Sequence, residues 1–144
     1  MSGLTLPVTL SAAAACAFIN FWLAMRIVKI RTAEKINIGD GGNERLIARM
    51  RAHLNFAEYA PIVLILLALT EFAWGANIGL WAAAVLFVVA RIAHPIGMDG
   101  WIPARAVGVA LTMATMLGLA IYAIVILTTG GTPDVAIPLP PAMG

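Results

Sequence analysis

Long apolar stretches separated by short polar segments form the main pattern of the sequence. No charged residue lies between Leu6 and Met25, and a second uncharged run extends from Ala106 to Pro133. A helix that crosses a bilayer needs about 20 predominantly apolar residues. The pattern therefore predicts four membrane-spanning helices, at about residues 6–28, 44–72, 78–94 and 103–129.

Capping and turn residues mark the expected ends of these helices. Asn43 and Asn77 are suited to cap the starts of the second and third helices, and Gly75 is suited to end the second. Pro95 is expected to end the third helix at His94, because proline disfavours a helical conformation in the residue before it.

The composition is that of a membrane protein. Hydrophobic residues make up 62% of the 144 residues and charged residues 11%, and the mean hydropathy is +0.95. In lipid, each helix satisfies its own backbone hydrogen bonds, and the alternating segments of a β-barrel do not occur in the sequence. We therefore expect an all-α bundle of helices that run up, down, up and down as one membrane domain over residues 1–144. Residues 133–144 contain four prolines and are expected to form an extended tail.

The basic residues lie on one side of the predicted bundle. All nine lysines and arginines are in or beside the first and third connections, and the N-terminus, the second connection and the tail have none. The positive-inside rule places both basic connections in the cytoplasm and both termini away from it. This placement accounts for the pI of about 9.1 without a nucleic-acid partner. The residues are Arg26, Lys29, Arg31, Lys35, Arg45, Arg49, Arg51, Arg91 and Arg105.

Polar residues continue into the second helix along one face. The uncharged run from Tyr59 to Thr70 has 12 residues, which is too short to cross a bilayer, so the span must include the polar residues before it. Arg51, Asn55 and Glu58 are spaced i, i+4 and i+7 and therefore share a helical face. Ionisable groups inside a span are costly and indicate a functional site. A buried polar network that joins helices is the alternative interpretation.

The chemistry of this face defines the ligand that it could bind. Arg51 offers parallel donors to a carboxylate, and Glu58 can hold an ammonium group. Asn55 can donate and accept hydrogen bonds, and Tyr59 adds a hydroxyl at the edge. The sequence therefore predicts a site for a small, polar, zwitterionic molecule.

Residues of the other helices add to this hypothesis. Arg91 and Arg105 are expected at the same level of the membrane, and a buried arginine stabilises a nearby anion such as a thiolate. His94 is interpreted as a capping or interfacial residue and Cys16 as a packing residue. The single cysteine and the spacing of the two histidines predict no metal site. The small-residue stripe of the fourth helix is interpreted as a packing face and comprises Gly108, Thr112, Thr115 and Leu119.

Taken together, these residues resemble the MAPEG superfamily, the membrane-associated proteins in eicosanoid and glutathione metabolism. The likeness covers about residues 5–130 and includes four short spans, a basic first inner loop and a polar motif at the start of the second span. The motif and its basic companions are Arg26, Arg51, Asn55, Glu58, Tyr59, Arg91 and Arg105.

The resemblance implies a homotrimer that binds glutathione, as co-substrate, between neighbouring subunits near the cytoplasmic face. The family residue that matches Arg105 is assigned stabilisation of the glutathione thiolate, which makes Arg105 the expected catalytic residue. His53 stands where one branch of the family has a glutamine. The expected glutathione contacts are Arg26, Arg51, His53, Asn55, Glu58, Tyr59, Arg91 and His94.

Other positions differ from part of the family. The eicosanoid enzymes carry tyrosines near the end of the third span, where this chain has His94 and Met98. The short loops and the glycine-rich turn at residues 39–42 look more like the bacterial members, which implies the inner membrane of a bacterium.

These features leave three functional hypotheses. The first is an enzyme that transfers glutathione to a lipophilic electrophile, or uses glutathione to reduce one, while surrounded by membrane lipids. The second is a non-catalytic membrane scaffold, or a subunit that binds glutathione or a lipid. The third, a proton path through Glu58, is disfavoured because no second acidic residue continues the path through the membrane. The next acidic residue of the same helix, Glu71, lies about 20 Å farther along it.

Overall fold

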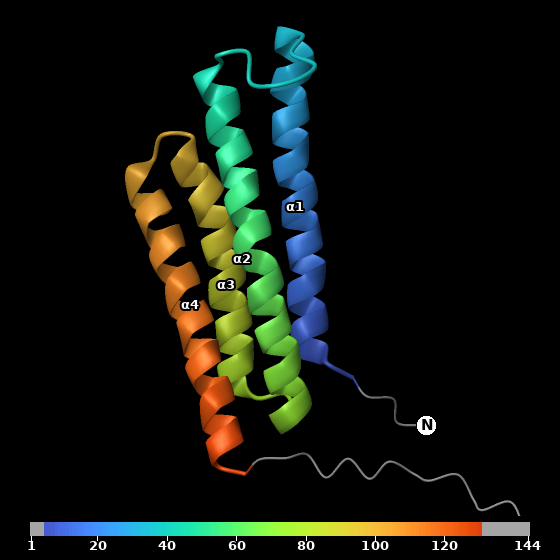
Figure 1. Cartoon of the computed structure of the whole chain (residues 1–144), viewed down its shortest axis with the longest axis vertical. Coiled ribbons are helices and arrows are strands. Elements are labelled where there is room, and N and C mark those ends of the chain that lie inside the picture. Colours follow the sequence, from blue (N-terminus) through green and yellow to red (C-terminus); the bar gives the residue numbers. More distant parts are fainter. Residues whose placement is uncertain (1–4, 131–144) are drawn as a thin grey trace, which may run out of the picture.

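The computed structural model describes residues 5–130, which form four α-helices joined by short loops (Figure 1). Each helix is long and apolar enough to cross a membrane. The predicted all-α fold with four helices able to span a bilayer is therefore confirmed, and the segment 133–144 lies outside the described residues. The helices are α1 (Pro7–Glu34), α2 (Glu44–Trp74), α3 (Ile78–Met98) and α4 (Ile102–Thr128).

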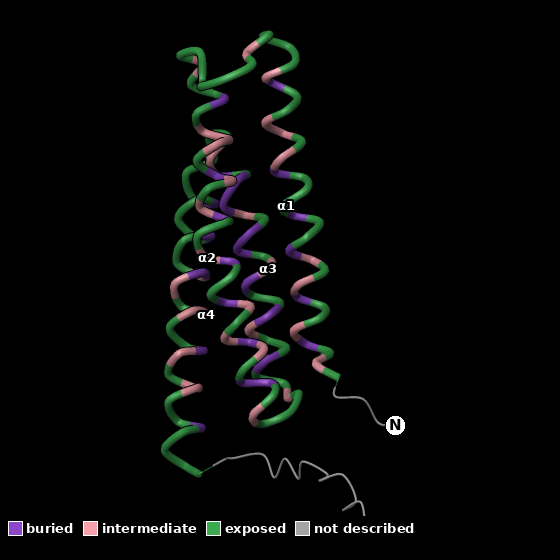
Figure 2. Tube along the Cα trace, turned by 45° about the vertical axis from the view of Figure 1, so that its right-hand side comes forward, coloured by how far each residue is buried: buried purple, intermediate pink, exposed green. Residues whose placement is uncertain are grey.

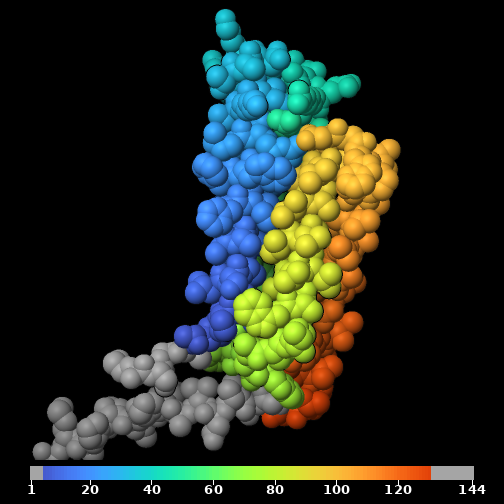
Figure 3. All heavy atoms as spheres, turned by 180° about the vertical axis from the view of Figure 1, so that it is seen from behind, coloured from blue at the N-terminus to red at the C-terminus, as the bar shows by residue number. Residues whose placement is uncertain are grey.

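Consecutive helices run in opposite directions, so the α1–α2 and α3–α4 loops lie at the same end of the bundle (Figure 1). We call this the basic end, because all nine lysines and arginines lie in its two loops or the adjoining helix ends. At this end α1 and α2 extend beyond the α3–α4 loop (Figure 3). Within residues 5–130, α1 and α4 make no contact with each other, so each has a flank that no helix of the same chain covers.

A stripe of buried residues on each helix faces the interior of the bundle (Figure 2). On α1 the stripe follows the helical period, from Val8 and Ala12 through Cys16 to Leu23. Phe87 of α3 is fully buried in the same cluster. The burial of Cys16 in this core confirms its interpretation as a packing residue.

The predicted caps are present at the starts of two helices. The Oδ1 atom of Asn43 accepts a hydrogen bond from the N–H of Leu46 at 3.0 Å, and that of Asn77 accepts one from Leu80 at 3.1 Å. Gly75 follows the last residue of α2 with a φ of 76°, which favours glycine. These outcomes confirm the expected starts of α2 and α3 and the expected role of Gly75.

The predicted end of α3 at His94 was wrong, because the helix continues to Met98 with Pro95 inside it. Proline removes one backbone hydrogen bond, but packing can outweigh this local cost. Pro95 and Gly97 are both buried. The guanidinium of Arg26 donates to the Pro95 carbonyl at 3.4 Å. Contacts with other helices therefore hold the last turn in helical form.

Glu71 has a structural role that was not predicted. Its carboxylate is buried near the end of α2 and accepts hydrogen bonds from the N–H groups of Val8 at 2.8 Å and Thr9 at 2.7 Å. These groups belong to the first turn of α1, where Leu6 supplies no side-chain cap. Glu71 thus caps a different helix, and both of its oxygens are occupied.

Two glycines allow α3 and α4 to approach closely at the basic end. A Cβ atom on Gly97 would clash with the backbone of Arg105, and a Cβ on Gly108 would lie 2.7 Å from the backbone nitrogen of His94. The two contacts are reciprocal, because each glycine packs against a residue of the facing helix. They set the distance between His94 and Arg105 through the backbone.

We predict that Gly108→Ala destabilises the protein by about 1–3 kcal/mol, because the added methyl group forces the two helices apart. The measurement is reversible unfolding in micelles with increasing amounts of a denaturing detergent. Gly118→Ala on the same helix is the matched control, since its Cβ would meet nothing within 4 Å. Equal destabilisation by both substitutions would show that close approach at Gly108 does not limit the packing of α3 on α4.

Candidate functional site

A polar cleft of about 340 Å³ opens at the basic end where α2, α3 and α4 meet. Five of the nine site residues expected from the sequence line it. Leu54, Met98 and Val109 add apolar walls. The five are Arg51, Asn55 and Glu58 from α2, His94 from α3 and Arg105 from α4.

Two features of the chain bring the residues of this cleft together: the helical spacing along α2 and the close contact between α3 and α4. Arg51, Asn55 and Glu58 line the same wall, as their i, i+4, i+7 spacing predicts. His94 and Arg105 reach the cleft because their backbones pack against the facing glycines. Residues that are distant in the sequence are thus brought to one cavity.

The charged groups of the cleft are available to a ligand. Within residues 5–130 Arg51, Glu58 and Arg105 form no ion pair, since the two ion pairs of this part of the chain both involve Asp99. The Nδ1 atom of His94 is buried and has no hydrogen-bond partner among the described residues. The cleft therefore combines two guanidinium groups and a carboxylate with the side chain of His94 in its wall. This set can bind a molecule that carries both acidic and amine groups.

Arg91 is buried behind the cleft and does not line it. Its guanidinium donates to Asn55 Oδ1 at 3.0 Å, to the Thr112 hydroxyl and to the Gly108 carbonyl at 3.5 Å. Tyr59 is half-buried beside it, with its ring centre 5.9 Å from the guanidinium carbon. Arg91 therefore holds Asn55 in position, whereas the resemblance implied that it contacts glutathione directly.

The small-residue face of α4 is buried, as its interpretation as a packing face predicts, but Thr112 also has a polar role that was not predicted. Its hydroxyl accepts from Arg91 and donates to the Gly108 carbonyl at 2.7 Å. Periodicity indicated that this face is buried. The signal for its polar partner was the single arginine within the otherwise uncharged third span.

His53 and Arg26 do not line the cleft of their own chain. His53 Nε2 is 2.8 Å from Asn20 Oδ1, which joins α2 to α1. Arg26 pairs with Asp99 of the α3–α4 loop and lies over the Trp22 ring, 4.9 Å from its centre. A single chain therefore does not bring these two expected contacts to the other five.

Asp99 joins three parts of the basic end. Besides Arg26 of α1 it contacts Arg49 of α2, whose Nε lies 3.5 Å from Asp99 Oδ1. Arg49 also donates to the Arg26 carbonyl at 3.1 Å. This role of Asp99 was not predicted, although an acidic residue between two basic segments was a signal for such an ion cluster.

A membrane bundle of four helices with a polar cleft at its basic end is the general class that the structure defines. The sequence model of the MAPEG family matches residues 9–125, and the chain therefore belongs to the MAPEG family. No curated protein matches the chain at a significant level. Within residues 5–130 no group of three or more histidine, cysteine or acidic side chains could hold a metal ion.

We predict energetic coupling between Arg91 and Asn55. A hydrogen bond from a charged donor contributes about 1.5–3 kcal/mol, so a double-mutant cycle of Arg91→Met and Asn55→Ala should give a coupling free energy of that size. The measurement is the free energy of unfolding of the parent, both single variants and the double variant. A second cycle with Arg91→Met and His53→Ala is the control, because His53 bonds to Asn20 instead. Additive effects in the first cycle would contradict the positioning role.

Proposed function

We propose that this MAPEG protein is a membrane-bound enzyme that uses glutathione as co-substrate, either transferring it to lipophilic electrophiles or using it to reduce them. The observation that supports the proposal is the polar cleft. Arg51, Asn55 and Glu58 of α2 line it together with Arg105 of α4. The family match adds an association with glutathione metabolism. The lipophilic second substrate would arrive from the surrounding bilayer.

The polar groups of glutathione match those of the cleft. The tripeptide carries two carboxylates, one ammonium group and one thiol. Arg51 would bind a carboxylate through parallel N–H donors, and Glu58 would bind the ammonium group. Asn55, whose oxygen is already held by Arg91, would offer its amide N–H groups. His94, which lines the cleft, would replace one tyrosine contact of the eicosanoid enzymes.

Arg105 is proposed to act on the sulfur atom. Its guanidinium stays protonated and stabilises the thiolate, which is the nucleophilic form of the thiol. In transfer, the thiolate sulfur forms a bond to an electrophilic carbon, and the leaving group departs with the electrons of the broken bond. Arg105 is exposed in the single chain. Its guanidinium would be more effective once bound substrates and a neighbouring subunit exclude water, because the dielectric constant would then be lower.

The proposed enzyme is a homotrimer with the cleft shared between subunits. Arg26 and His53 do not line the cleft of their own chain, and in a trimer they would complete the cleft of a neighbour. The uncovered flanks of α1 and α4 offer surfaces for such a contact. Glu58 is exposed in the isolated chain. A neighbouring subunit at the cleft would also shield this carboxylate from lipid.

The proposed orientation places the basic end and the glutathione cleft in the cytoplasm. The protein would be an integral inner-membrane protein with both termini on the opposite side. A C-terminal reporter that is active only in the cytoplasm should therefore be silent, whereas the same reporter inserted in the α1–α2 loop should be active. An active C-terminal reporter would contradict this orientation and place the cleft on the other face.

We predict different effects from removing the two arginines of the cleft. Arg51→Ala should mainly raise the KM for glutathione, because Arg51 would contact a carboxylate in both the ground state and the transition state. Arg105→Ala should lower turnover about 100-fold or more, as loss of an anion-stabilising donor does. It should also raise the pH at which bound glutathione ionises, because the neighbouring positive charge is lost. The measurements are thiolate absorbance against pH and initial rates with a soluble lipophilic electrophile.

Two further variants serve as controls for the ionisation of bound glutathione. Arg105→Lys keeps the charge and should recover part of the ionisation, whereas Arg31→Ala removes a basic residue outside the cleft and should leave the ionisation unchanged.

Native mass spectrometry of the parent in mild detergent should show trimers, and monomers alone would contradict the shared cleft. Binding of glutathione without any ionisation of its thiol would identify a non-catalytic subunit instead.

A further inference from the structure

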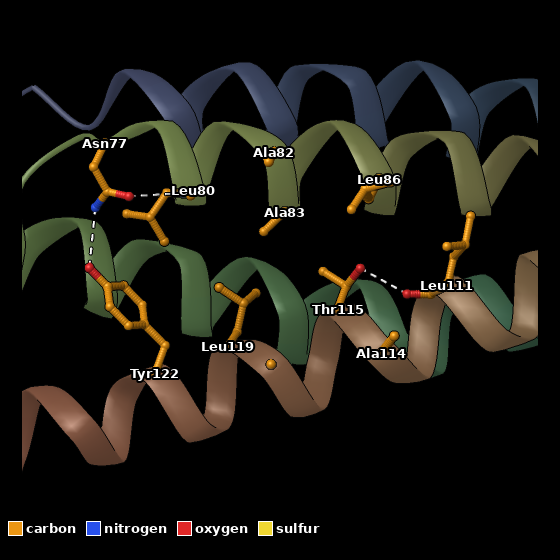
Figure 4. Close-up of a pocket in the computed structure, with 12 residues that line it drawn as sticks. Asn77, Leu80, Ala82, Ala83, Leu86, Leu111, Ala114, Thr115, Leu119 and Tyr122 are labelled. Atoms are coloured by element: carbon orange, nitrogen blue, oxygen red, sulfur yellow. Dashed lines mark hydrogen bonds between the residues drawn. The ribbon is translucent and has the colours of Figure 1, made fainter.

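A second cavity of about 410 Å³ lies between α3 and α4 in the half of the bundle away from the basic end. Figure 4 shows Asn77 and Tyr122 at one end of this groove and Leu86 and Leu111 at the other. None of its lining residues lines the polar cleft. The groove is therefore a separate feature of the molecule.

Small residues leave the groove open. Ala82 of α3 and Ala114 and Gly118 of α4 line it, and a Cβ on Gly118 would meet nothing within 4 Å. Gly108 on the same helix differs, because its missing side chain lets α3 pack closely. The space beside Gly118 is thus not filled by any described part of the chain.

The groove is apolar along its length and polar at one end. No charged side chain lines it, and the Thr115 hydroxyl donates to the Leu111 carbonyl of its own helix at 2.8 Å. At the far end Asn77 Nδ2 donates to the Tyr122 hydroxyl at 3.3 Å, while Asn77 Oδ1 caps α3. In the described part of the chain the Tyr122 hydroxyl donates to no acceptor, so its hydrogen is free to bond to a ligand.

The polar end lies at the start of α3, where a helix that crosses a bilayer would meet the interface that contains the lipid ester groups. Asn77 immediately precedes α3, and exposed Trp74 and Trp81 lie near it in the sequence, as expected at an interface between membrane and water. From Tyr122 to Leu111 the groove follows α4 inward for about 16 Å by the helical rise. Its complement is therefore an uncharged chain that ends in a hydrogen-bond acceptor near the interface.

We infer that the groove binds one acyl chain of a glycerophospholipid from the leaflet opposite the basic end. The ester carbonyl accepts a hydrogen bond from the Tyr122 hydroxyl, and the methylene groups extend inward between Ala82 and Ala114 toward Leu86 and Leu111. The apolar lining stabilises the chain by burial, and the hydroxyl selects its ester end.

The first test maps the groove with a photoreactive lipid. Full-length protein is reconstituted in phosphatidylcholine vesicles that contain phosphatidylcholine with a diazirine in the middle of one acyl chain. After irradiation, mass spectrometry should find stronger labelling at Ala114 and Gly118 than at Leu117, which is exposed on the same helix outside the groove. Uniform labelling around α4 would overturn the proposal. Absence of label in the groove would also overturn it and would indicate that a second copy of the chain or the segment 131–144 covers the groove.

Substitutions then separate the groove from the general lipid surface. Ala114→Leu combined with Gly118→Leu fills the groove and should reduce its labelling to the level of Leu117. Ala106→Leu adds the same side chain to an exposed alanine of α4 outside the groove and should leave the labelling unchanged. Labelling that survives filling of the groove would overturn the site.

The second test concerns the ester group. Native mass spectrometry should show that the parent retains diester phosphatidylcholine better than the diether lipid of equal chain length. Tyr122→Phe should remove this preference and lower retention of the diester about two- to tenfold, the effect of one neutral hydrogen bond. Equal retention of diester and diether lipid by the parent would overturn the role of Tyr122.

Discussion

The buried guanidinium of Arg91 is the interaction on which the basic end of the bundle depends. It reaches from α3 to the Asn55 side chain on α2 and to the Thr112 hydroxyl and Gly108 carbonyl on α4. A buried charge is costly unless polar groups surround it, and here hydrogen-bond acceptors and two aromatic rings supply that environment. Any movement of α2 or α4 against α3 would break these bonds. The geometry of the cleft is thus tied to the packing of the core.

Glycine and arginine act together in this arrangement. Gly108 lets α4 approach the backbone of His94, and the same glycine supplies a carbonyl to Arg91. A larger residue would separate the helices and weaken the hydrogen bond as well. Close packing in lipid has no hydrophobic driving force between helices, so such backbone contacts and interhelical hydrogen bonds carry more of the stability than in a soluble bundle.

Much of the fold could be predicted because bilayer thickness and helical period leave few alternatives. The apolar runs defined four helices, and Asn43 and Asn77 marked two of the starts because their side chains cap locally. The end of α3 was missed, since packing of Pro95 overrides its local preference. Glu71 was also missed, because its partners are the N–H groups of a helix far away in the sequence.

The candidate site was predictable to the extent that it follows one helix. Spacing alone puts Arg51, Asn55 and Glu58 on one wall, and the resemblance to MAPEG proteins added His94 and Arg105. A resemblance could not separate a ligand contact from a residue that supports one, which is why Arg91 was expected among the glutathione contacts. The pairing of Arg26 with Asp99 depends on how far the α1–α2 end extends past the α3–α4 loop, a property of the assembled bundle.

The cap that Glu71 provides has a consequence for how the chain enters the membrane during synthesis. The carboxylate lies 63 residues after its partner Val8, so α1 emerges from the ribosome long before its cap exists. Until α2 has been synthesised and inserted, the first N–H groups of α1 depend on water or lipid headgroups for hydrogen bonds. The α1–α2 hairpin is therefore the smallest segment in which the first N–H groups of α1 have their protein partner. Insertion of α2 supplies the cap for the helix that preceded it.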